Sequence, residues 1–167
     1  MKRLHKDQRG LTIIELLVVI ILTALITTAI TTTFFQVFNM NARTANHMAA
    51  LSQVQHAGKI VSEDILQAQN VTPGASSGFP LTLTWVVNAT HEIIYTLDEG
   101  ELWQSESIDG GEPPILTRVA EYINPDETSC HLEGDVLIFK VTATVGEGTW
   151  GEESEQRIYR VQPRPGT

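Results

Sequence analysis

A long segment without charged residues constrains this chain more than any other feature of its sequence. After Glu15, no Asp, Glu, Lys or Arg occurs until Arg43. A helix needs roughly 20 apolar residues to cross a bilayer, so this segment is long enough to span one. A carboxylate at the edge of such a span is costly unless it is paired. Glu15 therefore requires a partner.

The residues before this segment form a short basic leader. It contains one acid, Asp7, and four basic residues: Lys2, Arg3, Lys6 and Arg9. This excess of positive charge favours a cytoplasmic location for the N-terminal end. A conventional secretory signal is the alternative, and the small residues of Thr27-Thr28-Ala29 could serve as its cleavage site. Glu15 does not suit that alternative, because the apolar cores of secretory signals rarely carry an acid.

The junction of the leader and the apolar segment resembles the type IV pilin and pseudopilin family. The resemblance is carried by residues 9–17, which read Arg-Gly-Leu-Thr-Ile-Ile-Glu-Leu-Leu. It implies cleavage between Gly10 and Leu11 by a membrane prepilin peptidase, which also methylates the new amino group of Leu11. Leu11 stands where Phe is commonest in the family. The resemblance further implies that Glu15 meets the N-terminal amine of a neighbouring subunit during assembly.

The pattern of the chain predicts one long helix in two parts. Residues 11–38 are expected to form a transmembrane and filament-core helix, and residues 39–70 its amphipathic continuation. Proline is absent from residues 38–69, and Gly58, either a packing site or a weak point, is the one glycine there. The expected apolar stripe of the second part consists of Met40, Met48, Leu51, Val54, Val61 and Ile65. Pro73 then disfavours further helix.

A β-rich head, residues 71–167, is expected to follow. Alternating residues predict strands at 81–87, 136–145 and 156–161, and a hairpin at 93–104 with its turn at 98–100. Residues 115–123 are compatible with a further short strand. The fold class is therefore α+β and pilin-like, with the long N-terminal helix packed on a small antiparallel sheet.

Charge and cysteine content restrict the function of the head. Without residues 1–10 the chain would carry seven basic and 19 acidic residues, a net charge of −12. Such acidity opposes binding to nucleic acid, whose affinity comes largely from neutralised phosphates, so no nucleic-acid partner is expected. The single cysteine, Cys130, excludes an intramolecular disulfide and is expected to be buried and inert.

No catalytic, metal or cofactor site is expected. His47 and His56 are nine residues apart, which places them on opposite faces of a helix. The glutamates of residues 146–155 lack a fixed spacing for calcium ligands, and a solvated acidic loop explains them. A small basic cluster, expected to be ordinary surface charge, consists of Arg157, Arg160 and Arg164. Trp85 and Trp103 are expected in the core, whereas Trp150 is a candidate contact for a partner.

These observations predict a structural protein that acts by assembly. The hairpin and the last strand resemble the heads of pseudopilin J and minor pilin W, which implies a minor subunit of a type IV pilus, secretion pseudopilus or competence pilus. Its expected partners are the prepilin peptidase, other pilin subunits, the inner-membrane assembly platform and the lipid bilayer. The expected location is the inner membrane, crossed once with the head outside the cytoplasm, and then the fibre. The alternative is a conventional anchored or secreted binding protein.

Overall fold

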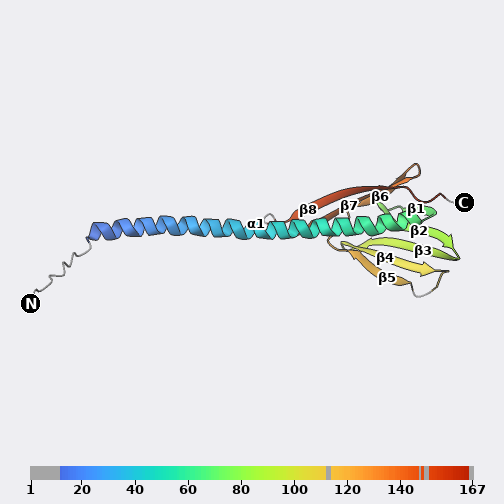
Figure 1. Cartoon of the computed structure of the whole chain (residues 1–167), viewed down its shortest axis with the longest axis horizontal. Coiled ribbons are helices and arrows are strands. Elements are labelled where there is room, and N and C mark those ends of the chain that lie inside the picture. The colour runs from blue at the N-terminus through green and yellow to red at the C-terminus, as the bar shows by residue number, and fades with distance from the viewer. Residues whose placement is uncertain (1–11, 112–113, 147, 149–150, 166–167) are drawn as a thin grey trace, which may run out of the picture. The chain divides into compact units, whose positions relative to one another are not determined.

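The computed structural model describes residues 12–111, 114–146, 148 and 151–165. The chain divides into two units, Met1–Asn41 and Ala42–Thr167. Helix α1 (Ile13–Gln67) contributes to both units (Figure 1). The long N-terminal helix and the antiparallel strands that follow it give the expected α+β, pilin-like architecture.

In the first unit, the described chain is helical from residue 13 onward. Every residue from 12 to 41 is exposed. Neither proline nor glycine, the residues that interrupt helices most strongly, occurs in residues 12–41. The helix therefore continues without a break through residues 13–41, and its apolar side chains there are exposed.

In the second unit, α1 buries a stripe of small and branched residues. The buried residues recur at helical spacing and are Ala50, Val54, Ala57, Gly58, Val61 and Ile65. The expected stripe was wrong at two positions, because the side chains of Met40 and Met48 are 71% and 60% exposed. Met48 lies about 130° from the centre of the buried stripe at 100° per residue, so it faces solvent.

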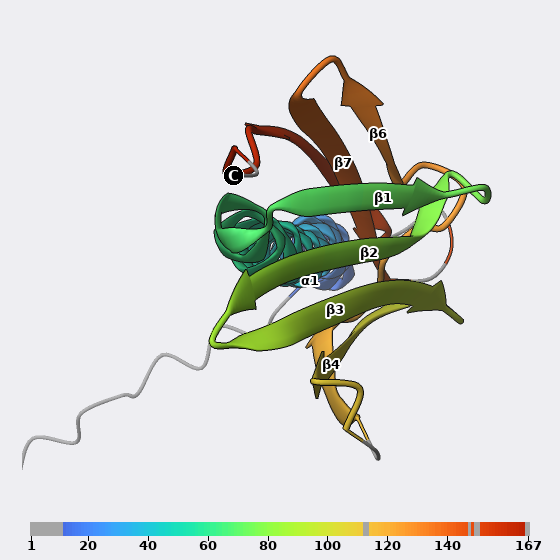
Figure 2. The same cartoon turned by 90° about the vertical axis from the view of Figure 1, so that its right-hand side faces the viewer.

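Five strands form the larger sheet of the head. Their order follows the sequence, and every neighbouring pair is antiparallel: β1 (Asn70–Gly74), β2 (Gly78–Val87), β3 (Ala89–Asp98), β4 (Glu101–Ile108) and β5 (Ile115–Ala120). Figure 2 shows β1, β2 and β3 lying side by side next to α1. The expected strand at 81–87 and the expected hairpin are confirmed as β2, β3 and β4.

Three strands form the second sheet. They are β6 (Ser129–Glu133), β7 (Val136–Val145) and β8 (Glu153–Val161), and β7 lies in the middle. The expected strands at 136–145 and 156–161 are confirmed as β7 and β8. Strands β6 and β1 are not predicted by the sequence pattern. Residues 70–74 end the helix and also form β1, where Pro73 is tolerated because β1 is an edge strand.

Both sheets contact the second part of α1. Asp64 of the helix accepts a hydrogen bond from Tyr95 of β3, and the carbonyl oxygen of Val54 accepts one from Tyr159 of β8. The core of the head lies along these contacts. Its largest fully buried side chains include Ile65 from the helix and residues from both sheets: Leu81, Leu83, Tyr95, Leu102, Leu137 and Phe139.

Close packing between Gly78 and Cys130 joins the two sheets. The amide of Cys130 donates a hydrogen bond to the carbonyl oxygen of Ser77 over 2.8 Å. Gly78 has a φ of +90°, and a Cβ at this position would collide with the carbonyl oxygen of Cys130. Only glycine therefore combines this backbone conformation with this approach of the strands.

Candidate functional site

The start of α1 is held by three reciprocal hydrogen bonds between Thr12 and Glu15. The amide of Glu15 donates to Oγ1 of Thr12 over 3.3 Å. In return, the amide and the hydroxyl of Thr12 each donate to Oε2 of Glu15 over 3.1 Å. This is a capping box, which satisfies backbone donors at a helix N-terminus. The amide and the hydroxyl of Thr12, in the same helical turn, are thus polar partners of the Glu15 carboxylate.

The capping box leaves part of the Glu15 carboxylate available. Both hydrogen bonds from Thr12 use Oε2, and within the part of the chain that the structure describes, Oε1 has no hydrogen bond and the carboxylate has no ion pair. The side chain is exposed. It therefore has an oxygen free to accept a hydrogen bond from a cationic group outside the chain.

The threonines in the first half of α1 form hydrogen bonds from their hydroxyl groups to the backbone of the same helix. Six of these hydroxyls donate to backbone carbonyl oxygens three or four residues earlier, over 2.8–2.9 Å: those of Thr23, Thr27, Thr28, Thr31, Thr32 and Thr33. Unsatisfied polar groups are costly in hydrocarbon. These bonds make the threonines compatible with an apolar environment.

By length and composition, α1 is able to cross a membrane. It is the one helix with that property among the described residues, and its most apolar window is not buried within the chain. Large side chains exposed along the segment include Leu16, Ile20, Leu25, Ile30, Phe34 and Phe38. Contiguous apolar surface of this extent marks contact with a membrane or with other protein.

Inside the head, Asp64 forms a hydrogen-bonded triangle with two strands. Its Oδ2 accepts hydrogen bonds from the hydroxyl of Tyr95 and, over 2.6 Å, from the amide of Gln104. Burial raises the pKa of Asp64, and the hydrogen bonds from Tyr95 and Gln104 partly oppose that rise. Burial, together with the neighbouring Asp64, also raises the pKa of Tyr95. The triangle fastens α1 to β3 and β4.

A second set of polar contacts joins α1 to the first residues of β8 and to the segment just before it. Nδ2 of Asn46 donates a hydrogen bond to the carbonyl oxygen of Gly151 over 2.6 Å. Nδ1 of His47 lies 3.0 Å from Oε1 of Glu155. The sequence does not predict this pair, because residues 47 and 155 come together only in the folded head.

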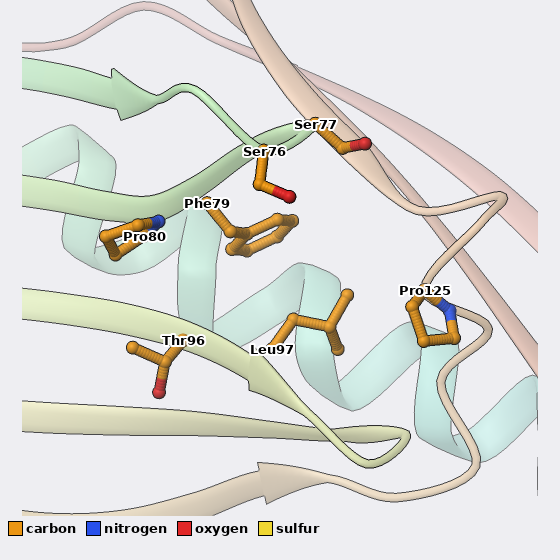
Figure 3. Close-up of a pocket in the computed structure, with 7 residues that line it drawn as sticks. All are labelled: Ser76, Ser77, Phe79, Pro80, Thr96, Leu97 and Pro125. Carbon is orange, nitrogen blue, oxygen red and sulfur yellow. The ribbon is translucent and has the colours of Figure 1, made fainter.

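The cavity in Figure 3 offers no acid–base chemistry. It has a volume of about 280 Å³ and lies between the β1–β2 turn, β3 and the segment after β5. Figure 3 shows the rings of Phe79 and Pro125 and the side chain of Leu97 around it, with the hydroxyls of Ser76 and Ser77 nearby. None of its lining residues titrates near neutral pH. The cavity therefore contains none of the usual general acids or bases.

Cys130 is buried and inert, as expected. Its side chain is 3% exposed, and Sγ lies 2.9 Å from the carbonyl oxygen of Gly78. Burial raises the pKa of the thiol to about 12. Because the thiolate is the reactive form, this residue is a poor nucleophile. Over the described residues there is no group of three or more His, Cys, Asp or Glu side chains that could hold a metal ion.

The structure confirms the expected position of one tryptophan and of the three arginines, and it contradicts that of a second tryptophan. Trp85 is 9% exposed and stacks on His91 with a ring-centroid distance of 5.2 Å, so its core position is confirmed. The expectation for Trp103 was wrong. It is only partly buried and faces away from the helix, because its neighbours Leu102 and Gln104 occupy the inner face of β4. The expected surface arginines, Arg157, Arg160 and Arg164, are exposed.

Three of the expected site residues lie outside the described part of the chain. They are Gly10 and Leu11 at the expected cleavage point and Trp150 in the expected partner contact. Thr12 and Glu15 are therefore the described residues next to the expected cleavage point.

The comparison with known families matches this N-terminal region. Residues 5–31 match the family described as the prokaryotic N-terminal methylation motif. Neither curated proteins nor solved structures provide a match. Together with the long helix and antiparallel sheets, the motif supports a type IV pilin-like protein of the prepilin type. The motif also supports a role as a substrate of prepilin peptidase and implies assembly with other pilins, and the motif and the apolar helix suggest membrane anchoring.

Proposed function

We propose that this chain is a minor subunit of a type IV pilus, type II secretion pseudopilus or competence pilus. One observation carries the proposal: the apolar side chains of residues 13–38 are exposed in a helix whose first turns lie within the methylation motif, residues 5–31. Such a surface needs lipid around it before assembly and other helices around it afterwards. The subunit then works as a structural component and not as a catalyst.

Processing would occur between Gly10 and Leu11. The new N-terminal amine would belong to Leu11, one residue before the capping residue Thr12. The methylated amine and the start of α1 would therefore be adjacent in the mature chain. Removal of the basic leader would also remove the charges that favour a cytoplasmic N-terminal end, after the head has crossed to the other side of the membrane.

During assembly, Glu15 would keep its partner Thr12 and gain a second one on a neighbouring subunit. In the single chain its Oε2 receives the hydrogen bonds of the capping box. In the fibre, Oε1 would accept the N-terminal ammonium group of a neighbouring subunit. An ion pair in a low-dielectric helical bundle is strongly favoured over a lone charge, so this contact would set the register between neighbouring helices.

The assignment as a minor subunit rests on the head. The hairpin of β3 and β4 and the last strand, β8, resemble those of pseudopilin J and minor pilin W. The head also lacks the possibility of an internal disulfide, since Cys130 is the single cysteine of the chain, whereas many major pilins close a C-terminal loop with such a bond. Minor subunits initiate or cap a fibre, and major subunits form its length.

Expression with a prepilin peptidase tests the proposal. The full chain is produced in membranes with the active peptidase, and with an inactive peptidase variant as the control. Intact mass and N-terminal sequencing should then show N-methyl-Leu11 in the first sample and an uncut leader in the second. A new terminus near Ile30, or an uncut leader beside the active enzyme, would instead identify a conventional signal or anchor.

A further inference from the structure

The first four residues of β5 have neither face of the strand covered. Ile115 pairs with Glu106 and Leu116 with Ser105, so these two side chains point to opposite faces of the sheet. Each is 66% exposed, and the two residues that follow are exposed as well. A strand at the edge of an antiparallel sheet ordinarily buries one face against the core. This segment of β5 buries neither.

The outer edge of β5 is also open. The strand pairs with β4 on one side, and over the described residues no backbone hydrogen bond reaches it from the other side. Figure 1 shows β5 at the border of the five-stranded sheet. Proteins usually protect such an edge with prolines, inward charges or covering segments. The exposed Ile115 and Leu116 make this edge suited to pairing with another strand.

Residue types common in interface centres lie on this edge or near it. Trp103 lies directly opposite Arg118, and Leu116 is two residues away on the same face. Tyr122 follows, 52% exposed and with a φ of +60°, a conformation that bulky residues adopt rarely. Tryptophan, tyrosine and arginine are enriched among residues that dominate binding energy.

The charge around β5 selects the kind of strand that can pair with it. Residues 98–122 contain seven acids and one base, Arg118. The base is already engaged, because its guanidinium nitrogens lie 2.9 Å from Glu101 and 2.6 Å from Glu121. Glu106 lies opposite Ile115 and has no ion pair among the described residues. A second copy of this head would bring the same negative charge and be repelled.

We propose that β5 is a docking edge for an extended basic segment of another protein, which adds to the sheet as a sixth strand. Lysine or arginine would alternate with branched apolar residues in that segment. Main-chain hydrogen bonds would provide affinity, and the alternate side chains would provide specificity. This interaction belongs to the head and does not depend on cleavage at Gly10 or on Glu15.

The test uses the full chain in detergent micelles and three synthetic peptides with blocked ends. The probe is an eight-residue peptide in which lysine alternates with valine. One control peptide replaces two central residues by proline, which prevents strand pairing, and the other replaces lysine by glutamate. Fluorescence anisotropy measures binding, and amide hydrogen exchange locates it. Only the probe should bind, and protection should appear in residues 115–120.

Variants of matched charge locate the contact. Leu116→Lys should weaken binding of the probe by about tenfold or more, because a charged residue blunts the edge and repels the peptide. Ile158→Lys adds the same charge at an exposed position of β8 and should leave the affinity unchanged. Absence of binding, equal binding of the proline peptide, protection on another strand, or a dimer abolished by Leu116→Lys would each overturn the proposal.

Discussion

The ring of Tyr159 lies directly over Gly58. Its hydroxyl donates a hydrogen bond to the carbonyl oxygen of Val54 over 3.2 Å, and a Cβ at position 58 would collide with the ring. Gly58 is thus a packing site that lets β8 approach the helix closely, and not a weak point. Glycine in a helix is less stable than alanine by about 1 kcal/mol, and the packing of Tyr159 on the helix offsets this cost.

A larger residue at position 58 should destabilise the head. Gly58→Leu should lower the free energy of unfolding by about 1–3 kcal/mol, because it overfills a packed contact. Urea denaturation of the full chain in micelles measures the change, with Gln55→Leu on the exposed side of α1 as the matched control. If Tyr159 is the obstacle, adding Tyr159→Ala to Gly58→Leu should cost less than the two single changes together.

The stability of the head should carry a pH dependence from Asp64. Its pKa is raised in the folded state above the ordinary value of 3.8. The folded state therefore binds the proton more tightly than the unfolded state. The stabilisation from the protonated form is complete below pH 3.8 and is lost as the pH rises through the folded-state pKa.

Replacement by a neutral amide isolates this effect. Asp64→Asn can still accept the hydrogen bonds from Tyr95 and Gln104 but does not titrate. In urea denaturation from pH 3 upward, wild-type stability relative to Asp64→Asn should fall as the pH rises. Glu63→Gln, at an exposed neighbouring position, should not reproduce the difference. Parallel pH profiles for wild type and Asp64→Asn would contradict a raised pKa at Asp64.

Cys130 should resist alkylation in the folded protein. Its thiol is buried, and its pKa is raised to about 12, so little thiolate exists at pH 8. Intact mass after treatment with iodoacetamide should show slow modification in micelles and rapid modification in guanidinium chloride. Rapid labelling of the folded chain would mean that the contact between Gly78 and Cys130 opens readily.

The two roles of Glu15 should be separable by substitution. Glu15→Gln keeps a side chain that can complete the capping box but removes the negative charge. We expect processing at Gly10 to persist while incorporation into fibres falls strongly. Intact mass reports processing, and immunoblotting of sheared fibres reports incorporation. Normal incorporation would count against the ion pair with a neighbouring subunit.

Thr12→Val provides the complementary change. It removes the hydroxyl of the cap and keeps the charge of Glu15, so it should weaken the start of the helix by about 0.5–2 kcal/mol. Incorporation should remain closer to wild type than in Glu15→Gln. A larger defect in Thr12→Val would assign the main role to the cap and not to the charge.

Patterns that are local in sequence predicted much of this architecture. The run without charge and without proline predicts the long helix, and period-two alternation predicts β2, β3, β4, β7 and β8. Each pattern is local because the exposure of the side chains follows the periodicity of a single helix or strand. Segments with weaker patterns were missed. β1 contains turn residues around Pro73, and β6 is exposed at three of its five positions, so neither carries a clear alternation.

The features of the candidate site also divide into those that are local in sequence and those that depend on folding. The leader, the motif and the lone acid Glu15 are contiguous, so the sequence by itself determined that this is a prepilin-type chain with an apolar N-terminal helix. Only the tertiary structure decided that Tyr159 covers Gly58, that Asp64 meets Tyr95 and Gln104, and that Met48 and Trp103 face outward. Periodicity shows that a residue lies on a face, but the partner on that face depends on how distant segments pack together.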